Sequence, residues 1–224
     1  ERAFAAAHEK GYKLAVATGR PASHLRDGLV RASWLDWIIS SSGAVICHAG
    51  AEEPLIRLSI PHKLMREAVD LTKGLAFRRW LDTPGGFICE APSISSEHWP
   101  NPHWIPPGST IAEDVLAHPA AFAGAQKLML HFTGRDLRRE AQGILSDALA
   151  GRAEIADEGD WSLEVSPLGA SKGAASVLIC ERIGVAAKDS VAFGDSGNDL
   201  SFADTICPDA RHDGVAIWLE QHIL

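Results

Sequence analysis

Two aspartates stand four residues apart near the end of the chain. Asp195 and Asp199 belong to the segment GDSGND at residues 194–199, which directly follows an apolar run. Two carboxylates with Asn198 between them supply the oxygen ligands that a hard cation such as Mg²⁺ prefers. A solvated turn is the alternative, because turns favour the same Asp, Gly and Asn residues. The segment alone leaves both interpretations open.

The apolar run at residues 190–193 predicts a buried strand of an α/β sheet. The two acids would then lie on the turn at the C-terminal edge of that sheet, where open α/β sheets bind their ligands. Two other segments are expected at the same edge. Thr18 and Gly19 follow an apolar strand, and Lys172 lies at the start of a helix.

Each of these two segments has a simpler interpretation when taken alone. The hydroxyl of Thr18 and free N–H groups at a helix N-terminus form a cradle for a phosphate, but an N-capping Thr with a turn Gly is common in α/β proteins. Lys172 is unfavourable beside the positive end of a helix dipole unless an anion is near, but most single lysines are surface residues. Together, a hydroxyl, an ammonium and two metal-binding carboxylates at one sheet edge are the groups that phosphoryl transfer needs.

The expected elements form an α/β domain that is interrupted by a second module. Alternating helices and strands predict a doubly wound, Rossmann-like parallel sheet in residues 1–60 and 167–224, and residues 61–166 predict an inserted α+β module with a mainly antiparallel sheet. The expected helices cover residues 1–10, 22–32, 61–73, 110–117, 136–149, 171–183 and 214–223. The expected strands cover residues 13–17, 37–40, 44–47, 77–81, 86–90, 126–132, 154–156, 161–165 and 190–193.

Composition narrows the class of protein. The 224 residues are 46% hydrophobic and 22% charged, as in ordinary globular proteins. A formal charge of -8 argues against a nucleic-acid or anionic-membrane surface but allows a small anionic substrate at a local cluster of donors. The four cysteines are scattered and form no CxxC pair, which predicts buried free thiols. The sequence shows no membrane span or signal peptide, which together with the free thiols predicts a cytoplasmic protein. None of the ten histidines has the spacing of an HExxH zinc site.

Three motifs carry a family resemblance. Thr18-Gly19-Arg20 after an apolar strand, residues 171–173 (SKG) opening a helix, and residues 194–199 (GDSGND) resemble motifs II, III and IV of the haloacid dehalogenase (HAD) superfamily. A module inserted between motifs II and III is similar to the cap of the Cof-type, type IIB phosphatases, which include sugar-phosphate and sucrose-phosphate phosphatases. The resemblance extends over almost the whole chain.

The resemblance implies a role for each motif residue. Thr18 would hydrogen-bond the phosphate, with Gly19 beside it, and Lys172 would offset charge on the phosphate and on an aspartyl nucleophile. Asp195 would ligate Mg²⁺, Asp199 would support the metal or its waters, and Asn198 would contact the phosphate end of the site. Arg20 is similar to a family residue that faces the cap.

The sequence also departs from the family pattern. Family members begin with a strand bearing DxDGT, whose first Asp is the nucleophile and whose second is the general acid/base, and this chain has no such segment. Because the opening helix also lacks an N-cap, we expect further residues upstream of it. The chain after Phe202 reaches Asp213-Gly214 almost directly, where relatives have two helices and a strand, so we expect a missing segment there too. Ser42 stands where many relatives carry Asn.

Two functions remain open at this point. The first is a Mg²⁺-dependent phosphatase that hydrolyses a small phosphorylated metabolite through an aspartyl-phosphate. The second is a non-catalytic, phosphate-binding or regulatory relative without motif I, and a phosphomutase or phosphotransferase would share the aspartyl-phosphate step. Four aromatic and histidine residues in the inserted module could line a substrate pocket, although packing of a long loop is the favoured interpretation: His98, Trp99, His103 and Trp104.

Overall fold

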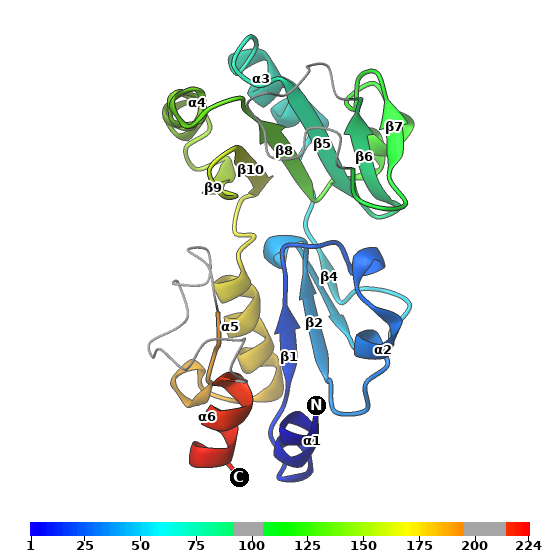
Figure 1. Ribbon diagram of the computed structural model, residues 1–224, viewed down its shortest axis with the longest axis vertical. Coiled ribbons are helices and arrows are strands. Elements are labelled where there is room, and N and C mark those ends of the chain that lie inside the picture. The colour runs from blue at the N-terminus through cyan, green and yellow to red at the C-terminus, as the bar shows by residue number, and fades with distance from the viewer. Residues whose placement is uncertain (92–104, 195–213) are drawn as a thin grey trace. The chain divides into compact units, whose positions relative to one another are not determined.

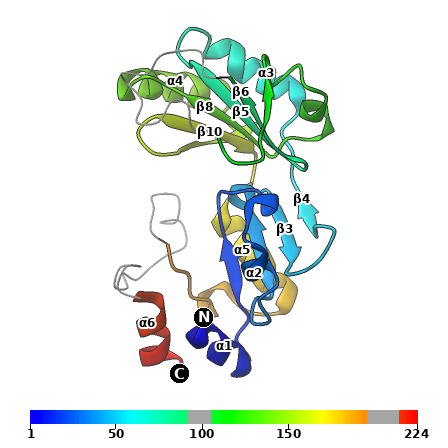
Figure 2. The same ribbon diagram turned by 45° about the vertical axis from the view of Figure 1, so that its right-hand side comes forward.

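A computed structural model describes residues 1–91, 105–194 and 214–224. The chain divides into two compact units. The first comprises residues 1–56 and 171–224, and the second comprises residues 57–170. Figures 1 and 2 label the elements of both units.

The first unit is built on a four-stranded sheet in the order β1-β2-β3-β4. The strands are β1 (Ala15–Ala17), β2 (Trp37–Ser40), β3 (Val45–His48) and β4 (Ile56–Arg57). Strand β1 pairs with β2 in parallel, but β2 pairs with β3 antiparallel. This hairpin differs from the expected parallel crossover because only a short turn, η2 (Ser41–Gly43), joins the two strands, and a parallel connection needs a dozen or more residues.

Helices cover both faces of this sheet. Trp37 and Ile39 of β2 pack against Ile179 of α5 (Lys172–Ile183), whereas Ile38 points to the other face and packs near α2 (Asp27–Val30). This alternation is the period of two expected for a strand that is buried on both faces. The other helices in the described residues of this unit are α1 (Arg2–Glu9), η1 (Ala22–His24), η4 (Ala187–Asp189) and α6 (Gly214–His222).

The second unit has a six-stranded sheet in the order β7-β6-β5-β8-β10-β9, in which only the β6–β7 pair is parallel. Helices α3 (His62–Leu71) and α4 (Arg135–Ala148) lie on one face of it and enclose a large apolar core that includes Met65, Leu81 and Leu145. The strands are β5 (Arg78–Thr83), β6 (Gly86–Glu90), β7 (Thr110–Ala112), β8 (Lys127–His131), β9 (Ala153–Asp157) and β10 (Ser162–Pro167), and a short helix is η3 (Pro119–Ala123). The unit is therefore the expected α+β module with a mainly antiparallel sheet.

Three sequence-based element predictions are wrong. Residues 110–117 do not form a helix, because Thr110 and Ile111 pair with β6 as strand β7. The helix expected over residues 22–32 is reduced to η1 and α2, in a segment that Gly28 weakens. Residues 190–193 do not form the expected buried strand, because none of the described strands pairs with them. Val191 in this segment is 54% exposed.

The described residues bear on the expectations for the cysteines and for membrane spans. Cys47, Cys89 and Cys180 are buried free thiols, as expected. No helix in the described ranges is both long and apolar enough to cross a membrane.

Candidate active site

Thr18 lies where β1 ends, beside β2. Its N–H donates to the carbonyl of Ile39 over 2.9 Å, which extends the parallel ladder by one residue. Its hydroxyl oxygen accepts a hydrogen bond from the N–H of Arg20 at 3.2 Å. A hydroxyl carries one proton and two lone pairs, so this acceptor bond leaves the proton of Thr18 available to donate. The half-buried Thr18 can therefore offer an O–H to an anion at this sheet edge.

The helix N-terminus expected after Thr18 and Gly19 is absent. Pro21 has an extended backbone (φ -62°, ψ 151°) and precedes η1, which has three residues, and α2 has only four. Helices this short have too few aligned peptides to make a strong dipole. The donors available here are consequently the Thr18 hydroxyl and local turn amides rather than a helix N-terminus.

Arg20 adds a positive charge at this edge of the first unit. Arg20 is exposed, and its charge adds to partial burial in lowering the pKa of nearby His24. A local positive field of this kind favours an anionic ligand even though the whole chain is acidic.

Lys172 begins α5, as the sequence predicts. The side chain of Ser171 caps this helix by accepting from the N–H of Ala174 at 3.0 Å. Lys172 follows directly as the first helical residue and is half-buried. Its ammonium therefore stands at the positive end of the α5 dipole, where an anion would relieve the repulsion.

The turn η2 links the Thr18 segment to the start of α5. The N–H of Ser42 donates to the carbonyl of Thr18 at 3.1 Å, and the N–H of Ser41 donates to the carbonyl of Arg20 at 2.9 Å. On its other side, a Cβ added to Gly43 would collide with the backbone of Ser171. The structure thus brings the motifs around Thr18 and Lys172 together through one turn.

This turn has an unusual backbone. Ser41 and Ser42 both have positive φ, of 50° and 57°, and Gly43 follows at 101°. A left-handed conformation costs an L residue with a Cβ about 1–2 kcal/mol. The sequence indicated a turn at Ser41-Ser42-Gly43 but not its contacts, because these join segments that are far apart along the chain.

The predicted metal and phosphate residues Asp195, Asn198 and Asp199 lie outside the described residues, as do His98, Trp99, His103 and Trp104. Across residues 1–91, 105–194 and 214–224, no group of three or more His, Cys, Asp or Glu side chains could hold a metal ion. The donor chemistry of the predicted set, two carboxylates and an amide oxygen, fits Mg²⁺.

The second unit carries a buried polar surface on the sheet face away from α3 and α4. Lys127 pairs with Glu164 at 2.9 Å, and both side chains are about 5% exposed or less. The hydroxyl of Ser166 donates to the same carboxylate at 2.6 Å. Strand alternation puts these groups opposite the apolar core. We call this set the polar sheet face; it also contains Arg78, Asp82, His131 and Ser162.

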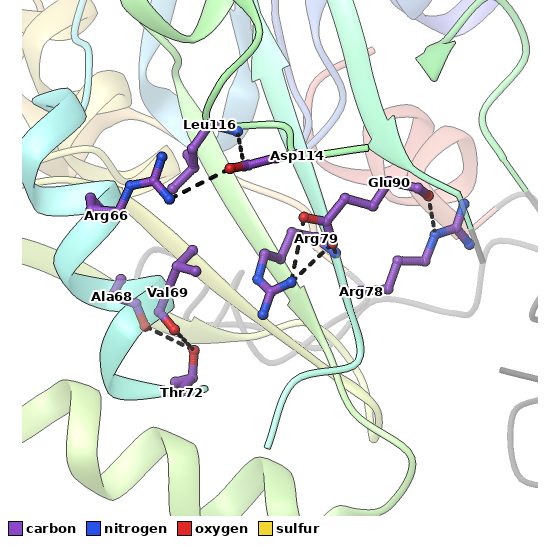
Figure 3. A network of polar contacts seen from close by, with 9 residues as sticks. All are labelled: Arg66, Ala68, Val69, Thr72, Arg78, Arg79, Glu90, Asp114 and Leu116. Carbon is purple, nitrogen blue, oxygen red and sulfur yellow. Dashed lines mark hydrogen bonds and ion pairs between the residues drawn. The ribbon is translucent and has the colours of Figure 1, made fainter. Parts of the chain in front are cut away.

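A shallow cavity on the helix side of the same sheet is occupied by its own ion pairs. It has a volume of about 260 Å³ and lies between α3 and strands β5 and β6. Figure 3 shows Arg79 paired with Glu90 (3.1 Å) and Arg66 paired with Asp114 (3.6 Å). Burial raises the pKa of Glu90, and Arg79 opposes that rise. These mutually satisfied charges give no reason to assign a ligand to the cavity.

His131 makes the second unit sensitive to acid. Burial, and then the charge of Arg78, lower the pKa of His131 to about 3, while its Nδ1 lies 2.7 Å from the Ser162 hydroxyl. The folded state therefore holds His131 neutral, whereas an unfolded histidine takes up a proton near pH 6.5. Stability is fully present above about pH 6.5 and is lost as the pH falls from there toward 3.

We expect His131→Gln to flatten this pH dependence, because Gln can keep a hydrogen bond to Ser162 without a charge. Between pH 6.5 and 4.5, wild type should lose about 2 kcal/mol more unfolding free energy than His131→Gln does. Urea denaturation at each pH measures the difference. The exposed His222 gives the control His222→Gln, whose profile should follow wild type; parallel profiles for all three proteins would contradict the assignment.

The two units and the paired edge motifs define an α/β core with an inserted α+β module, and comparison with known proteins gives the family. The haloacid dehalogenase-like hydrolase family matches residues 1–206. The chain therefore belongs to the haloacid dehalogenase-like hydrolases.

Individual relatives agree with this family. An HMP-PP phosphatase from Escherichia coli (strain 55989 / EAEC) is 38% identical over 73 residues, which are 33% of this chain and 27% of that protein. The match spans only about a quarter of that curated relative.

Solved structures match over nearly the whole chain. A sugar phosphatase of HAD subclass IIB has a TM-score of 0.76 at 18% identity, covering 98% of this chain and 89% of the other. A haloacid dehalogenase-like hydrolase from Bacteroides thetaiotaomicron has a TM-score of 0.74 at 20% identity, covering 98% and 90%. At these identities the likeness shows the fold, an α/β core with an inserted cap-type module, as predicted.

Proposed function

We propose that the protein is a Mg²⁺-dependent phosphatase that hydrolyses a small phosphorylated metabolite through an aspartyl-phosphate. The observation that carries this proposal is the joint placement of Thr18 and the start of α5, which turn η2 holds at one sheet edge. One group there can donate a hydrogen bond and the other carries a positive charge. Phosphoryl transfer is accelerated mainly by such positioned, charge-stabilising groups.

Each motif residue has a proposed role. Thr18 donates its hydroxyl proton to a phosphate oxygen, and a turn amide at Gly19 supports it. Lys172 offsets the negative charge of the phosphate and of the attacking carboxylate. Asn198 orients the phosphate, and Arg20 faces the substrate from the edge of the site.

We propose Asp195 and Asp199 as the residues that hold Mg²⁺. The bound ion would supply positive charge that neutralises the phosphate oxygens. Every remaining contribution in the described part of the chain comes from the hydroxyl, ammonium and amides at the sheet edge.

We propose that the nucleophile belongs to a DxD-bearing strand outside residues 1–224. Two features support an additional strand in the first unit. Strand β1 is at the edge of its sheet, and the apolar residues 191–193 have no partner among the described strands. A further strand would bury apolar side chains that are now half or fully exposed.

The second unit is proposed to be a cap that supplies substrate specificity, and a sugar phosphate is the proposed substrate class. The solved sugar phosphatase of HAD subclass IIB, which shares this fold, supports testing sugar phosphates first. We further propose a cytoplasmic location, which the buried free thiols Cys47, Cys89 and Cys180 fit. HMP-PP, which the curated relatives are named for, belongs in the same substrate panel.

The full-length protein should release phosphate from p-nitrophenyl phosphate when Mg²⁺ is added, and from one or more phosphorylated metabolites in a panel. A polypeptide of residues 1–224 alone should be inactive because it lacks the nucleophile. Phosphate release is measured colorimetrically, with EDTA-treated enzyme as the control. Binding of phosphate without turnover by the full-length protein would support a non-catalytic relative, and full activity of residues 1–224 would contradict the missing-nucleophile proposal.

A further inference from the structure

The turn η2 contacts two proposed phosphate-binding segments at once. Its amides donate to the carbonyls of Thr18 and Arg20, at 3.1 and 2.9 Å. Its glycine lies against the backbone of Ser171, immediately before Lys172. The turn therefore lies between the hydroxyl and the ammonium that the proposed reaction needs.

The geometry of the turn depends on its left-handed backbone. With Ser41 and Ser42 at positive φ, their two successive N–H groups reach carbonyls on the neighbouring Thr18 segment. A right-handed or extended backbone at Ser42 would redirect the chain that follows its N–H, so the Ser42–Thr18 hydrogen bond and the contact of Gly43 with Ser171 could not both be kept. Strained residues persist only where the surrounding structure fixes them, and they concentrate at functional sites.

Close packing fixes the other side of the turn. Gly43 is buried, has φ of 101°, and leaves no space for a Cβ against Ser171. The start of α5 can approach the sheet edge this closely only because residue 43 has no side chain. Moving the turn would therefore move Lys172 relative to Thr18.

We propose that turn η2 is a positioning element of the active site, with Ser42 and Gly43 as its positioning residues. The left-handed turn sets the separation between the Thr18 hydroxyl and the Lys172 ammonium to suit one phosphoryl group. Neither residue needs to touch the substrate for this role. The proposal rests on the proposed phosphatase function.

Substitutions at residue 42 separate backbone conformation from side-chain chemistry. Ser42→Gly and Ser42→Ala both remove the hydroxyl, but only Gly adopts the left-handed conformation without strain. Ser42→Val disfavours it most, because a β-branched side chain at positive φ is a marked outlier. Ser42→Asn introduces a residue that tolerates positive φ.

We expect kcat on p-nitrophenyl phosphate in the full-length protein to fall about 30-fold or more in Ser42→Val, with KM changed less than threefold. Mispositioned groups of this kind cost up to about 100-fold in rate. The kcat of Ser42→Gly and of Ser42→Asn should stay within about threefold of the wild-type value. The kcat of Ser42→Ala should lie between these values and that of Ser42→Val. Gly50→Val is the matched control: Gly50 also has positive φ (76°) with open space around it, so the control should lose stability without losing kcat.

Amide hydrogen exchange at residues 41 and 42 gives a readout that does not depend on activity. Slow exchange in wild type and Ser42→Gly, and faster exchange in Ser42→Val, are expected from the two hydrogen bonds of the turn. Wild-type kcat in folded Ser42→Val, or an equal loss of kcat in Ser42→Gly and Ser42→Val, would overturn the positioning role. An inactive wild type would instead overturn the proposed function, and rapid exchange of both wild-type amides would show that turn η2 is not held in place.

Discussion

Asp195→Asn should lower phosphate release by the full-length protein about 1000-fold or more at the Mg²⁺ concentration that just saturates wild type. The substitution keeps the size of the side chain and removes its negative charge, so it weakens binding of a hard cation that prefers carboxylate oxygens. A metal at a phosphoryl-transfer site contributes several kcal/mol of charge stabilisation, and about 4 kcal/mol corresponds to this factor. Stopped assays with p-nitrophenyl phosphate over a Mg²⁺ titration measure the effect.

The Mg²⁺ titration distinguishes a metal ligand from a residue that only supports the turn. A ligand predicts that activity of Asp195→Asn rises partly at high Mg²⁺, because the defect is in metal affinity. Asp189→Asn is the control, since Asp189 is an exposed acid a few residues earlier in η4 and should have no effect on rate. Full activity in Asp195→Asn would show that the metal assignment is wrong.

The sequence was most informative where local signals agree with one another. The β6 strand at residues 86–90 is bounded by turn residues, and α5 begins with an N-capping Ser, so both were predicted to within a residue. The motif residues Thr18 and Lys172 were also found, because each is marked by its position relative to a strand end or a helix start. Local chemistry is sufficient for such positions.

Non-local pairing explains what the sequence did not predict. Residues 110–112 are compatible with a helix or a strand, and only the parallel partner β6 decides between them. Residues 190–193 have the apolar character of a buried strand but no described strand beside them. The contacts of η2 with Thr18 and Ser171 likewise join segments that are 20 to 130 residues apart in sequence. Single-sequence patterns carry no information about such partners.

Lys172→Met should lower kcat/KM about 100- to 1000-fold while leaving the protein as stable as wild type or slightly more stable. The ammonium is proposed to neutralise a phosphate oxygen, and removing one such preorganised charge-stabilising group typically costs this much. Its position at the start of α5 has the opposite effect on folding, because a cation is unfavourable there by about 0.5 kcal/mol. Kinetics and urea denaturation on the same samples measure both quantities.

The opposite signs are the diagnostic feature of this prediction, because a lysine kept only for structure would lose stability together with activity. Lys188→Met is the control: Lys188 is an exposed lysine in η4, and its loss should change neither quantity. Lys172→Arg should recover only part of the activity, since a planar guanidinium does not place its charge where a compact ammonium does. Activity of Lys172→Met within a few-fold of wild type would show that Lys172 is a surface lysine, and would leave Thr18 and the turn as the only described groups at the phosphate.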